Sequence, residues 1–165
     1  MIVVSEPPIE KEMRVRKIVQ GTVIDHIPAG KSLTVMKLLG ISETTGEPIS
    51  IAINIPSSKL GKKDIIKLEN VFLSADDFSK LALIAPKVTI NKIKDMKIVQ
   101  KSYVSIPDQI NGIVHCINPI CITNKIGEPI TTKFMVINRK PLSIKCDYCG
   151  RMMEGEEIMA NLIFR

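Results

Sequence analysis

The feature that most constrains this chain is its set of four cysteines, which form two close pairs beyond residue 115. Four residues separate Cys116 from Cys121, two separate Cys146 from Cys149, and 24 residues lie between the pairs. Two such knuckles can converge on one tetrahedral ion, and four soft thiolates favour zinc over hard cations. Because four protein ligands leave no open position for water, the pattern predicts a structural Zn²⁺.

Two other chemistries remain compatible with four paired cysteines, namely disulfides and an iron centre. A reducing cytosolic compartment argues against a disulfide framework, and the spacing is typical of zinc sites. His115 stands next to Cys116 and could in principle replace it as a ligand. A fifth candidate beside a complete ligand set is more often a bystander, so we expect His115 not to bind the metal.

Composition places the chain among folded proteins, because 45% of its residues are hydrophobic and 24% are charged. No stretch of the sequence approaches the roughly 18 consecutive apolar residues of a membrane-spanning helix. The N-terminus lacks the basic segment followed by an apolar segment that is typical of a signal peptide. We therefore expect a cytoplasmic protein that does not contact membranes. A length of 165 residues allows one domain or two small ones, and the separate cysteine region favours two.

The pattern before the cysteines alternates strand and helix signals. Strands are expected over 15–27, 49–55, 64–73, 88–93 and 96–101, and helices over 28–40 and 74–85, the second with a capping box formed by Ser74 and Asp77. The order β-α-β-β-α-β predicts an α+β, ferredoxin-like sandwich. We expect a flexible arm over 1–13, this sandwich over 14–101, a linker over 102–107 and a small all-β zinc domain over 108–165.

The formal charge of +6 admits an anionic partner without naming it. Residues 1–101 carry +5 of this charge and residues 102–165 carry +1. Four thiolates and one Zn²⁺ would make the second domain slightly acidic, at about −1. We therefore expect a small anion on the first domain and a protein surface for the second. No tryptophan is present, which argues against stacking of nucleic-acid bases.

Several motifs are specific enough to suggest a family. The chain resembles the regulatory subunit of aspartate carbamoyltransferase in GTVIDHIPAG at 21–30, in the stretches at 54–74 and 81–93, and in the cysteine module from 116 to 149. The resemblance implies a nucleotide domain that binds ATP, CTP and UTP and a zinc domain that docks on the catalytic chain. It also implies regulatory homodimers, three of which bridge two catalytic trimers in the enzyme that opens pyrimidine synthesis.

The resemblance also assigns roles to individual positions. It places an asparagine that contacts the catalytic chain at Asn118, and the effector site at Val15, Ile18, Asp25, His26, Ile65, Lys67, Asn91, Ile93 and Lys101. Lysine ammonium groups suit a triphosphate, and Asp25 can accept from ribose hydroxyls or an amino group. The chain departs from familiar members at Arg16, Met96 and Ile120, so its base contacts and partner surface are expected to differ.

No catalytic constellation is visible in the sequence, which contains no phosphate-binding glycine loop and no serine elbow. We therefore expect a regulatory subunit that does not turn over substrate. Two alternatives from other classes are a zinc-ribbon protein that binds nucleic acid and a free-standing nucleotide sensor with another partner. The concentration of positive charge outside the cysteine module argues against the first.

Overall fold

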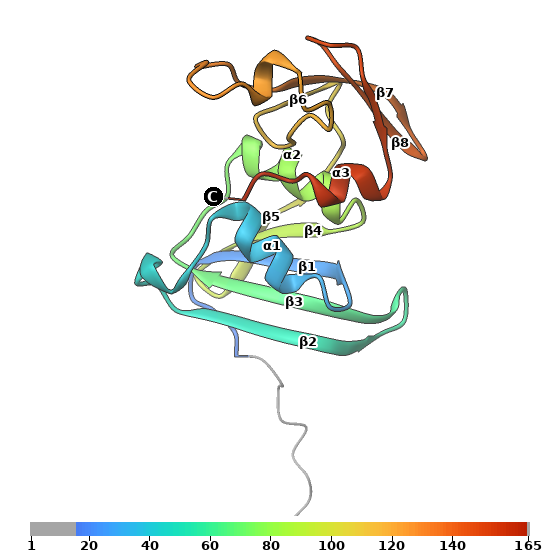
Figure 1. Cartoon of the computed structure of the whole chain (residues 1–165). Helices are drawn as coiled ribbons and strands as arrows, with labels where there is room; N and C mark the ends of the chain where they lie inside the picture. Colours follow the sequence, from blue (N-terminus) through green and yellow to red (C-terminus); the bar gives the residue numbers. More distant parts are fainter. Residues whose placement is uncertain (1–15, 165) are drawn as a thin grey trace, which may run out of the picture.

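The computed structural model describes residues 16–164, so the arm predicted over 1–13 lies outside the described residues. The first domain contains five strands and two α-helices in the order expected from the sequence (Figure 1). A single 3-10 turn, Glu43–Thr45, precedes the second strand. The elements are β1 Gly21–Pro28, α1 Ser32–Leu39, β2 Ile49–Ser57, β3 Gly61–Glu69, α2 Ala75–Ile84, β4 Thr89–Lys94 and β5 Lys97–Tyr103.

All neighbouring strands of this sheet are antiparallel, in the order β2-β3-β1-β4-β5. The first four strands have the ferredoxin-like arrangement, which confirms the predicted fold class. β5 adds a fifth strand beside β4 through a tight turn at Asp95 and Met96, whose φ angles are 50° and 60°. Two consecutive residues with positive φ are typical of a type I′ hairpin turn, which matches the twist of the paired strands.

Several predicted element boundaries differ from the structure, and three of them have a clear local cause. The strand expected over 15–27 begins at Gly21, where a Cβ would lie 2.0 Å from the carbonyl oxygen of Leu68 on the adjacent strand. The helix expected from Pro28 begins at Ser32, because Pro28 still pairs in β1. The strand expected to reach residue 73 ends at Glu69, since Asn70 adopts a φ of 57°. Such turns depend on backbone angles that apolar periodicity does not reveal.

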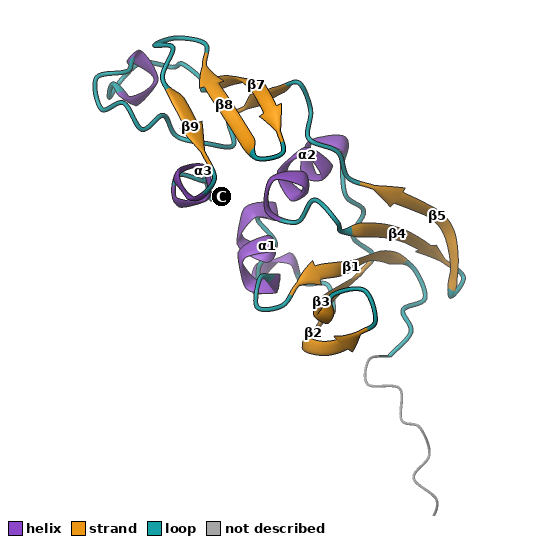
Figure 2. Ribbon diagram, turned by 90° about the vertical axis from the view of Figure 1, so that its right-hand side faces the viewer, coloured by secondary structure: helices purple, strands orange, loops and turns teal. Residues whose placement is uncertain are grey.

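Both helices cover one face of the sheet, as Figure 2 shows. The side chains beneath them come from alternate positions of the strands, so the sheet contributes every second residue to the core. The helix α1 ends at Gly40, whose φ of 66° stops it in the left-handed conformation. The fully buried set includes Ile24, Ile66 and Leu68 from the sheet and Val35, Leu38 and Leu81 from the helices.

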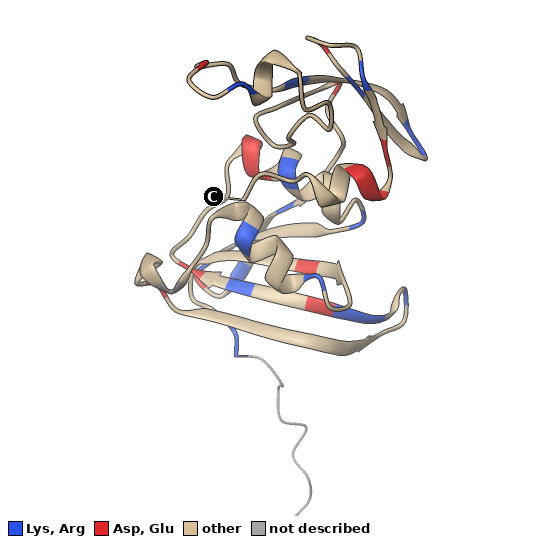
Figure 3. Cartoon of the chain, viewed as in Figure 1, with Lys and Arg blue, Asp and Glu red and all other residues tan. Residues whose placement is uncertain are grey.

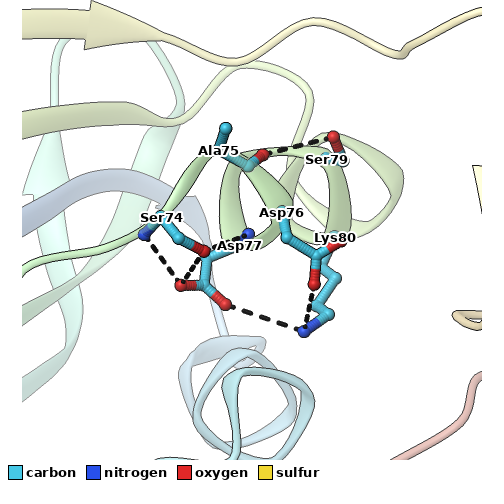
Figure 4. A network of polar contacts seen from close by, with 6 residues as sticks. All are labelled: Ser74, Ala75, Asp76, Asp77, Ser79 and Lys80. Carbon is cyan, nitrogen blue, oxygen red and sulfur yellow. Dashed lines mark hydrogen bonds and ion pairs between the residues drawn. The ribbon is translucent and has the colours of Figure 1, made fainter.

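The helix α2 begins with the predicted capping box (Figure 4). The Ser74 hydroxyl accepts from the backbone N–H of Asp77, and the Asp77 carboxylate accepts from the backbone N–H of Ser74 at 2.9 Å. Lys80 then reaches back along the helix, with its Nζ 3.0 Å from Asp76. These contacts satisfy free amides of the first turn and place negative charge at the helix N-terminus.

Substitution of Ser74 by alanine should lower the free energy of unfolding by about 1 kcal/mol, because the Asp77 amide loses its acceptor. Urea denaturation followed by circular dichroism measures this change. Ser79→Ala is the matched control, since its hydroxyl only bonds back to the carbonyl of Ala75 and alanine favours the helix interior. Equal stabilities of the two variants would contradict a contribution from the cap.

The second domain is built around a four-stranded antiparallel sheet in the order β6-β7-β8-β9. Its strands are β6 Gln109–Asn111, β7 Lys133–Arg139, β8 Leu142–Cys146 and β9 Met152–Glu154. A 3-10 turn, Ile122–Asn124, lies between β6 and β7, and the five-residue helix α3, Glu156–Ala160, follows β9. Phe134 of β7 is fully buried at the centre. This small strand domain with its four cysteines confirms the predicted second part of the fold.

The two domains share one continuous cluster of buried apolar side chains. The chain leaves β5 at Tyr103 and enters β6 at Gln109, and buried Val104 lies in the connection. After α3 the chain runs back to the start of the second domain, where Leu162 pairs with Val114. Figures 1 and 2 both show this C-terminal segment between the two sheets. Within residues 16–164, no helix has the length and apolar character needed to cross a membrane.

Candidate functional site

The four cysteines converge at one end of the second domain. Two come from the loop after β6, Cys146 ends β8, and Cys149 lies in the turn before β9. The Sγ atoms of Cys116 and Cys149 are 3.5 Å apart, those of Cys121 and Cys146 are 3.9 Å apart, and all four lie within 4.8 Å of one another. The edge of a tetrahedron with Zn–S bonds of about 2.3 Å is about 3.8 Å. A disulfide requires about 2.05 Å, so the arrangement fits an ion and not disulfides.

Backbone turns hold both cysteine pairs in shape. Gly150, with a φ of 73°, donates its N–H to the carbonyl of Cys146 at 2.9 Å and so closes the second turn. In the first pair, the N–H of Cys121 donates to the carbonyl of Asn118 at 3.0 Å. The side chain of Asn124 donates to the carbonyl oxygens of Cys116 and Asn118, at 2.7 and 2.9 Å. The sulfur geometry is therefore built into the fold of the loops.

The protonation of the thiols differs with their surroundings. Burial raises the pKa of Cys116 and of Cys146 above the usual value for a thiol. Burial also opposes ionisation of Cys149, but hydrogen bonds from the Arg151 backbone and the Asn118 amide, with the neighbouring thiols, lower its pKa to about 6. A metal ion binds thiolates, so it would keep all four deprotonated, and this donor set suits a soft divalent ion.

Asn118 has a structural role in this loop. Its Oδ1 accepts from the backbone N–H of Ile120 at 3.2 Å, while its side-chain amide bonds to the sulfur of Cys149. Residues that bond to metal ligands orient them and adjust their basicity. Ile120 itself is 90% exposed at the tip of the loop. The predicted contact of Asn118 with a catalytic chain stays a prediction.

The second group of predicted residues lies on the face of the first sheet that the helices leave open. Strand pairing puts Lys67, Val23, Asn91 and Lys101 in one row across β3, β1, β4 and β5. Directly paired residues point to the same face of a sheet. Lysines at both ends of the row therefore flank a buried asparagine, although 33 residues lie between them in the sequence.

A cavity of about 340 Å³ opens over one part of this row. It brings together five of the predicted effector residues, drawn from the segment before β1 and from three strands. Its wall is mainly apolar, which suits a flat aromatic ring, and its polar groups come from few residues. The lining residues are Lys17, Ile18, Val23, Asp25, Lys67, Asn91, Ile93, Met96 and Ile98.

A second cavity, of about 240 Å³, lies next to the first and contains the two remaining cationic candidates, His26 and Lys101. The first cavity ends at Asp25 and the second begins at His26, so the two are neighbours on β1. On β4, Asn91 lines the first cavity and Thr89 the second. The predicted site is therefore two compartments along one sheet face.

A bulge in β1 sets the boundary between the two compartments. The register of β1 against β3 shifts between Ile24 and Ile27, and His26 adopts a φ of 62°. Bulges commonly redirect a side chain at a site. Asp25 Oδ1 accepts from the Nζ of Lys63 at 2.7 Å, and the Nδ1 of His26 lies 3.4 Å from both Asp25 and Thr89. Neighbouring side chains thus hold both Asp25 and His26 in place.

Lys67 is held in a different way from the other lysines of the face. Its Nζ donates to the carbonyl oxygen of Arg16, and partial burial lowers its pKa from the usual lysine value. Arg16 therefore contributes its main chain to the wall near the first cavity. At its other end this wall includes Met96 of the β4–β5 turn, where the resemblance leads one to expect an aromatic side chain.

The remaining predicted positions fare differently. Val15 lies outside the described residues. Ile65 points to the same face as Lys67, two residues away on β3, but lines neither cavity. The sequence predictions omitted several lining residues, because these lie in loops or at strand positions to which no role in ligand binding was assigned. These are Lys17, Val23, Ile98, Lys59, Leu60, Lys87, Thr89 and Tyr103. The family-like stretches at 21–30, 54–74 and 81–93 contain Val23, Lys59, Leu60, Lys87 and Thr89, but no role was assigned to these positions.

The chain joins a domain with ligand-sized cavities to a domain whose four cysteines are arranged to hold a metal ion. Two family models match it. Residues 13–105 match the allosteric domain of the aspartate carbamoyltransferase regulatory chain, and residues 108–159 match the metal-binding domain of the same chain.

Curated relatives agree with both matches. Aspartate carbamoyltransferase regulatory chains from Pyrococcus abyssi, Pyrococcus horikoshii and Pyrococcus furiosus are 53%, 52% and 52% identical to this chain. Each comparison covers 92% of this chain and 99% of the relative. The chain therefore belongs to the family of aspartate carbamoyltransferase regulatory chains. It is a non-catalytic subunit with an allosteric domain and a metal-binding domain, as the motifs predicted.

Proposed function

We propose that this chain binds the nucleotide effectors ATP, CTP and UTP on the open face of its first sheet and transmits their effect to the catalytic chain. The observation that carries the proposal is the cross-strand row from Lys67 through Asn91 to Lys101, which runs beneath two adjoining cavities. A nucleotide has a flat apolar base, a polar sugar and an anionic tail. The apolar cavity suits the base and the sugar, and the basic cavity beside it suits the anionic tail.

The contacts available in the first cavity suit a base and a ribose. Within residues 16–164, the Oδ1 of Asn91 is buried without a hydrogen-bond partner, and Asn91 itself is only 8% exposed. A buried acceptor without a partner is costly, and the exocyclic amino group of adenine or cytosine would supply the missing donor. Asp25 would accept from a ribose hydroxyl, while Ile18 and Ile93 pack against the ring. Uracil offers a ring N–H in place of the amino group.

The cations of the site suit the phosphates. In the proposal, Lys67 lies beside the base and ribose, and Lys101 and His26 meet the triphosphate. Lys101 is exposed on β5, with its Nζ 5.8 Å from the ring centre of Tyr103. Ammonium groups act on phosphate as point charges, so their placement within the cavity matters more than their exact orientation.

Isothermal titration calorimetry of the full chain with ATP and CTP tests the site. Lys67→Ala and Lys101→Ala should each weaken binding about tenfold, because each removes a charge-assisted hydrogen bond. Lys37→Ala is the matched control, since Lys37 is exposed on α1 on the opposite side of the sheet. Unchanged affinity in both variants would contradict the proposed site.

The metal in the second domain is proposed to be one structural Zn²⁺, held by Cys116, Cys121, Cys146 and Cys149. Their spacing and the tetrahedral distances between their sulfurs support this ion. When bound, Zn²⁺ supplies folding free energy and no chemistry of its own. The loop that the zinc holds presents Ile120 and Ile126, which are 90% and 99% exposed. Their exposure and the neighbouring Asn118 support docking of this loop on the catalytic chain.

Assembly is proposed to follow the family pattern, with homodimers paired through their first domains and three dimers bridging two catalytic trimers. The edge strand β2 is available for such pairing. Ile51 and Ile53 of this strand are 38% and 47% exposed, and one side of its backbone has no neighbouring strand in the described chain. Exposed apolar edges favour pairing with another strand.

Transmission between the domains is supported by their shared core. The same apolar cluster contains the side chains beneath α1 and α2 and those of the second domain, including Ile110 and Leu162. A packed interface of this kind moves as a unit and does not deform gradually. An effector that prefers one arrangement would bias the catalytic chain by a coupling free energy of about 1–3 kcal/mol.

A further inference from the structure

The second cavity contains two lysines, Lys59 and Lys87, that are not among the predicted effector residues. We propose that Lys59 and Lys87 complete a polyphosphate compartment with His26 and Lys101, and that they make the affinity of this chain for a nucleotide depend on the charge of its phosphate tail. The inference rests on the proposed nucleotide function and adds its specificity-determining residues. The compartment is the cavity of about 240 Å³ described above.

The three lysines arrive from segments far apart in the sequence. Lys59 lies in the hairpin turn between β2 and β3, Lys87 precedes β4, and Lys101 lies on β5. Figure 3 shows lysine and arginine at the end of the sheet where the β2–β3 hairpin lies. Bringing like charges to one cavity is unfavourable unless an anion is shared among them. Convergence of three cations on one concave surface therefore indicates a multivalent anion.

Within residues 16–164, the charges of the three lysines of this compartment are not neutralised by acidic side chains. The described residues that line it are His26, Lys59, Leu60, Lys87, Thr89, Lys101 and Tyr103, and none of them is acidic. In contrast, Lys63 on the same hairpin is paired with Asp25. Between residues 16 and 164, Lys59, Lys87 and Lys101 form no ion pair of this kind. Their ammonium groups are available to a ligand.

The position of the compartment fits the tail of a nucleotide whose base occupies the first cavity. Asn91 and Thr89 are two residues apart on β4, which corresponds to about 7 Å along a strand. The first cavity has a mainly apolar wall around Asn91 and carries both lysine and aspartate, whereas the second has three lysines and no acidic residue around Thr89. A ligand that spans both therefore places its base in the more apolar compartment and its anionic end in the more basic one.

Calorimetry of the full chain at fixed ionic strength tests the inference with ATP, ADP, AMP and inorganic tripolyphosphate as ligands. The variants are Lys59→Gln, Lys87→Gln and their combination. Lys62→Gln is the control, because Lys62 is exposed on the same hairpin but lines neither cavity. Each lysine should account for about a fivefold change in ATP affinity, the upper range for an exposed ion pair, and the pair for about 25-fold.

The same variants should change AMP affinity by less than about twofold, and tripolyphosphate should bind to the wild-type chain and compete with ATP. If ATP binds and the double variant matches Lys62→Gln, or if it weakens AMP as much as ATP, the compartment is wrong and the nucleotide function stands. If no nucleotide binds but tripolyphosphate does, with loss in the double variant, the function fails and the compartment stands. If the wild-type chain binds neither, both are overturned.

Discussion

Cys146→Ser should release the metal and unfold the second domain. Cys146 ends β8 and is 1% exposed, so the change removes a ligand and places a hydroxyl in the same buried position. The binding free energy of a structural zinc site is about 10–16 kcal/mol in small zinc domains, and much of it is folding free energy. A sheet with strands of three to seven residues has little else to hold it together.

Three measurements check this result. The metal content should fall below one ion per chain, and the backbone amides of β6 to β9 should lose their protection from hydrogen exchange. Gel filtration with catalytic chains should show no complex. Removal of the metal from the wild-type chain by a chelator should give the same pattern, and added Zn²⁺ should restore it. The first sheet should keep its protection, because its own core includes Ile24, Ile66 and Leu81.

His115→Ala is the matched control for the cysteine variant. His115 is exposed and does not belong to the cluster of four ligands, although it is adjacent to Cys116. The His115 variant should keep one metal ion per chain and full association with catalytic chains. Retention of metal and of the complex by Cys146→Ser would show that the four-thiolate site is not what holds this domain together.

Asp64→Ala should lower the free energy of unfolding by about 3–5 kcal/mol, the largest effect expected of a single substitution in the first domain. Asp64 is fully buried on β3 and forms a junction between three segments. Its carboxylate accepts from the backbone N–H groups of Gly30 and Ser32, at 2.9 and 3.2 Å, and of Asn54, at 2.9 Å. Alanine would leave these donors without an acceptor.

Asp64→Ala should also weaken ligand binding at the proposed effector site. Gly30 and Ser32 belong to the turn that leads from β1 into α1, and Asn54 lies at a bulge of β2 with a φ of 60°. Lys63, the residue before Asp64, holds Asp25. Relaxation of this junction should therefore weaken ATP binding as well as stability. Urea denaturation measures the loss of stability, and calorimetry below the unfolding transition measures the loss of ATP affinity.

Asp108→Ala provides the comparison for Asp64. The side chain of Asp108 is 95% exposed, and its one ion pair among the described residues is with Arg139 at the surface. An exposed ion pair contributes about 0–1 kcal/mol, so this variant should remain close to the wild type in stability and in ATP affinity. A loss for Asp64→Ala no larger than that for Asp108→Ala would contradict the role of the buried carboxylate as a junction.

Much of the architecture is visible in local patterns of the sequence. The cysteine spacing predicts one metal centre, Ser74 and Asp77 predict the start of α2, and Gly40 predicts the end of α1. Each of these signals acts between residues that are near one another in the chain, so neighbouring residue types are sufficient to reveal it. The start of β1 and the end of β3 were predicted wrongly, because close strand approach at Gly21 and the positive φ of Asn70 decide them.

The predicted effector residues show what the sequence could not reveal. Motifs selected Asp25, Lys67 and Lys101 individually, but their common face depends on the pairing of four strands. The bulge at His26 divides the face into two compartments, and the residue types near it in the sequence do not predict a bulge. Lys59 and Lys87 lie in turns, where an exposed lysine usually means only a solvated charge. Their convergence is visible only after the strands have paired.

The sequence by itself therefore determined the order of the elements in the first domain, the presence of a separate cysteine module, the four metal-ligand candidates and the family. Only the tertiary structure decided that the sulfurs lie 3.5–3.9 Å apart across the two pairs, that β5 extends the sheet and that both domains share one core. The physical reason is the range of the interactions. Caps, turns and periodicity are local, whereas strand register and the meeting of charges depend on contacts between residues far apart in the chain.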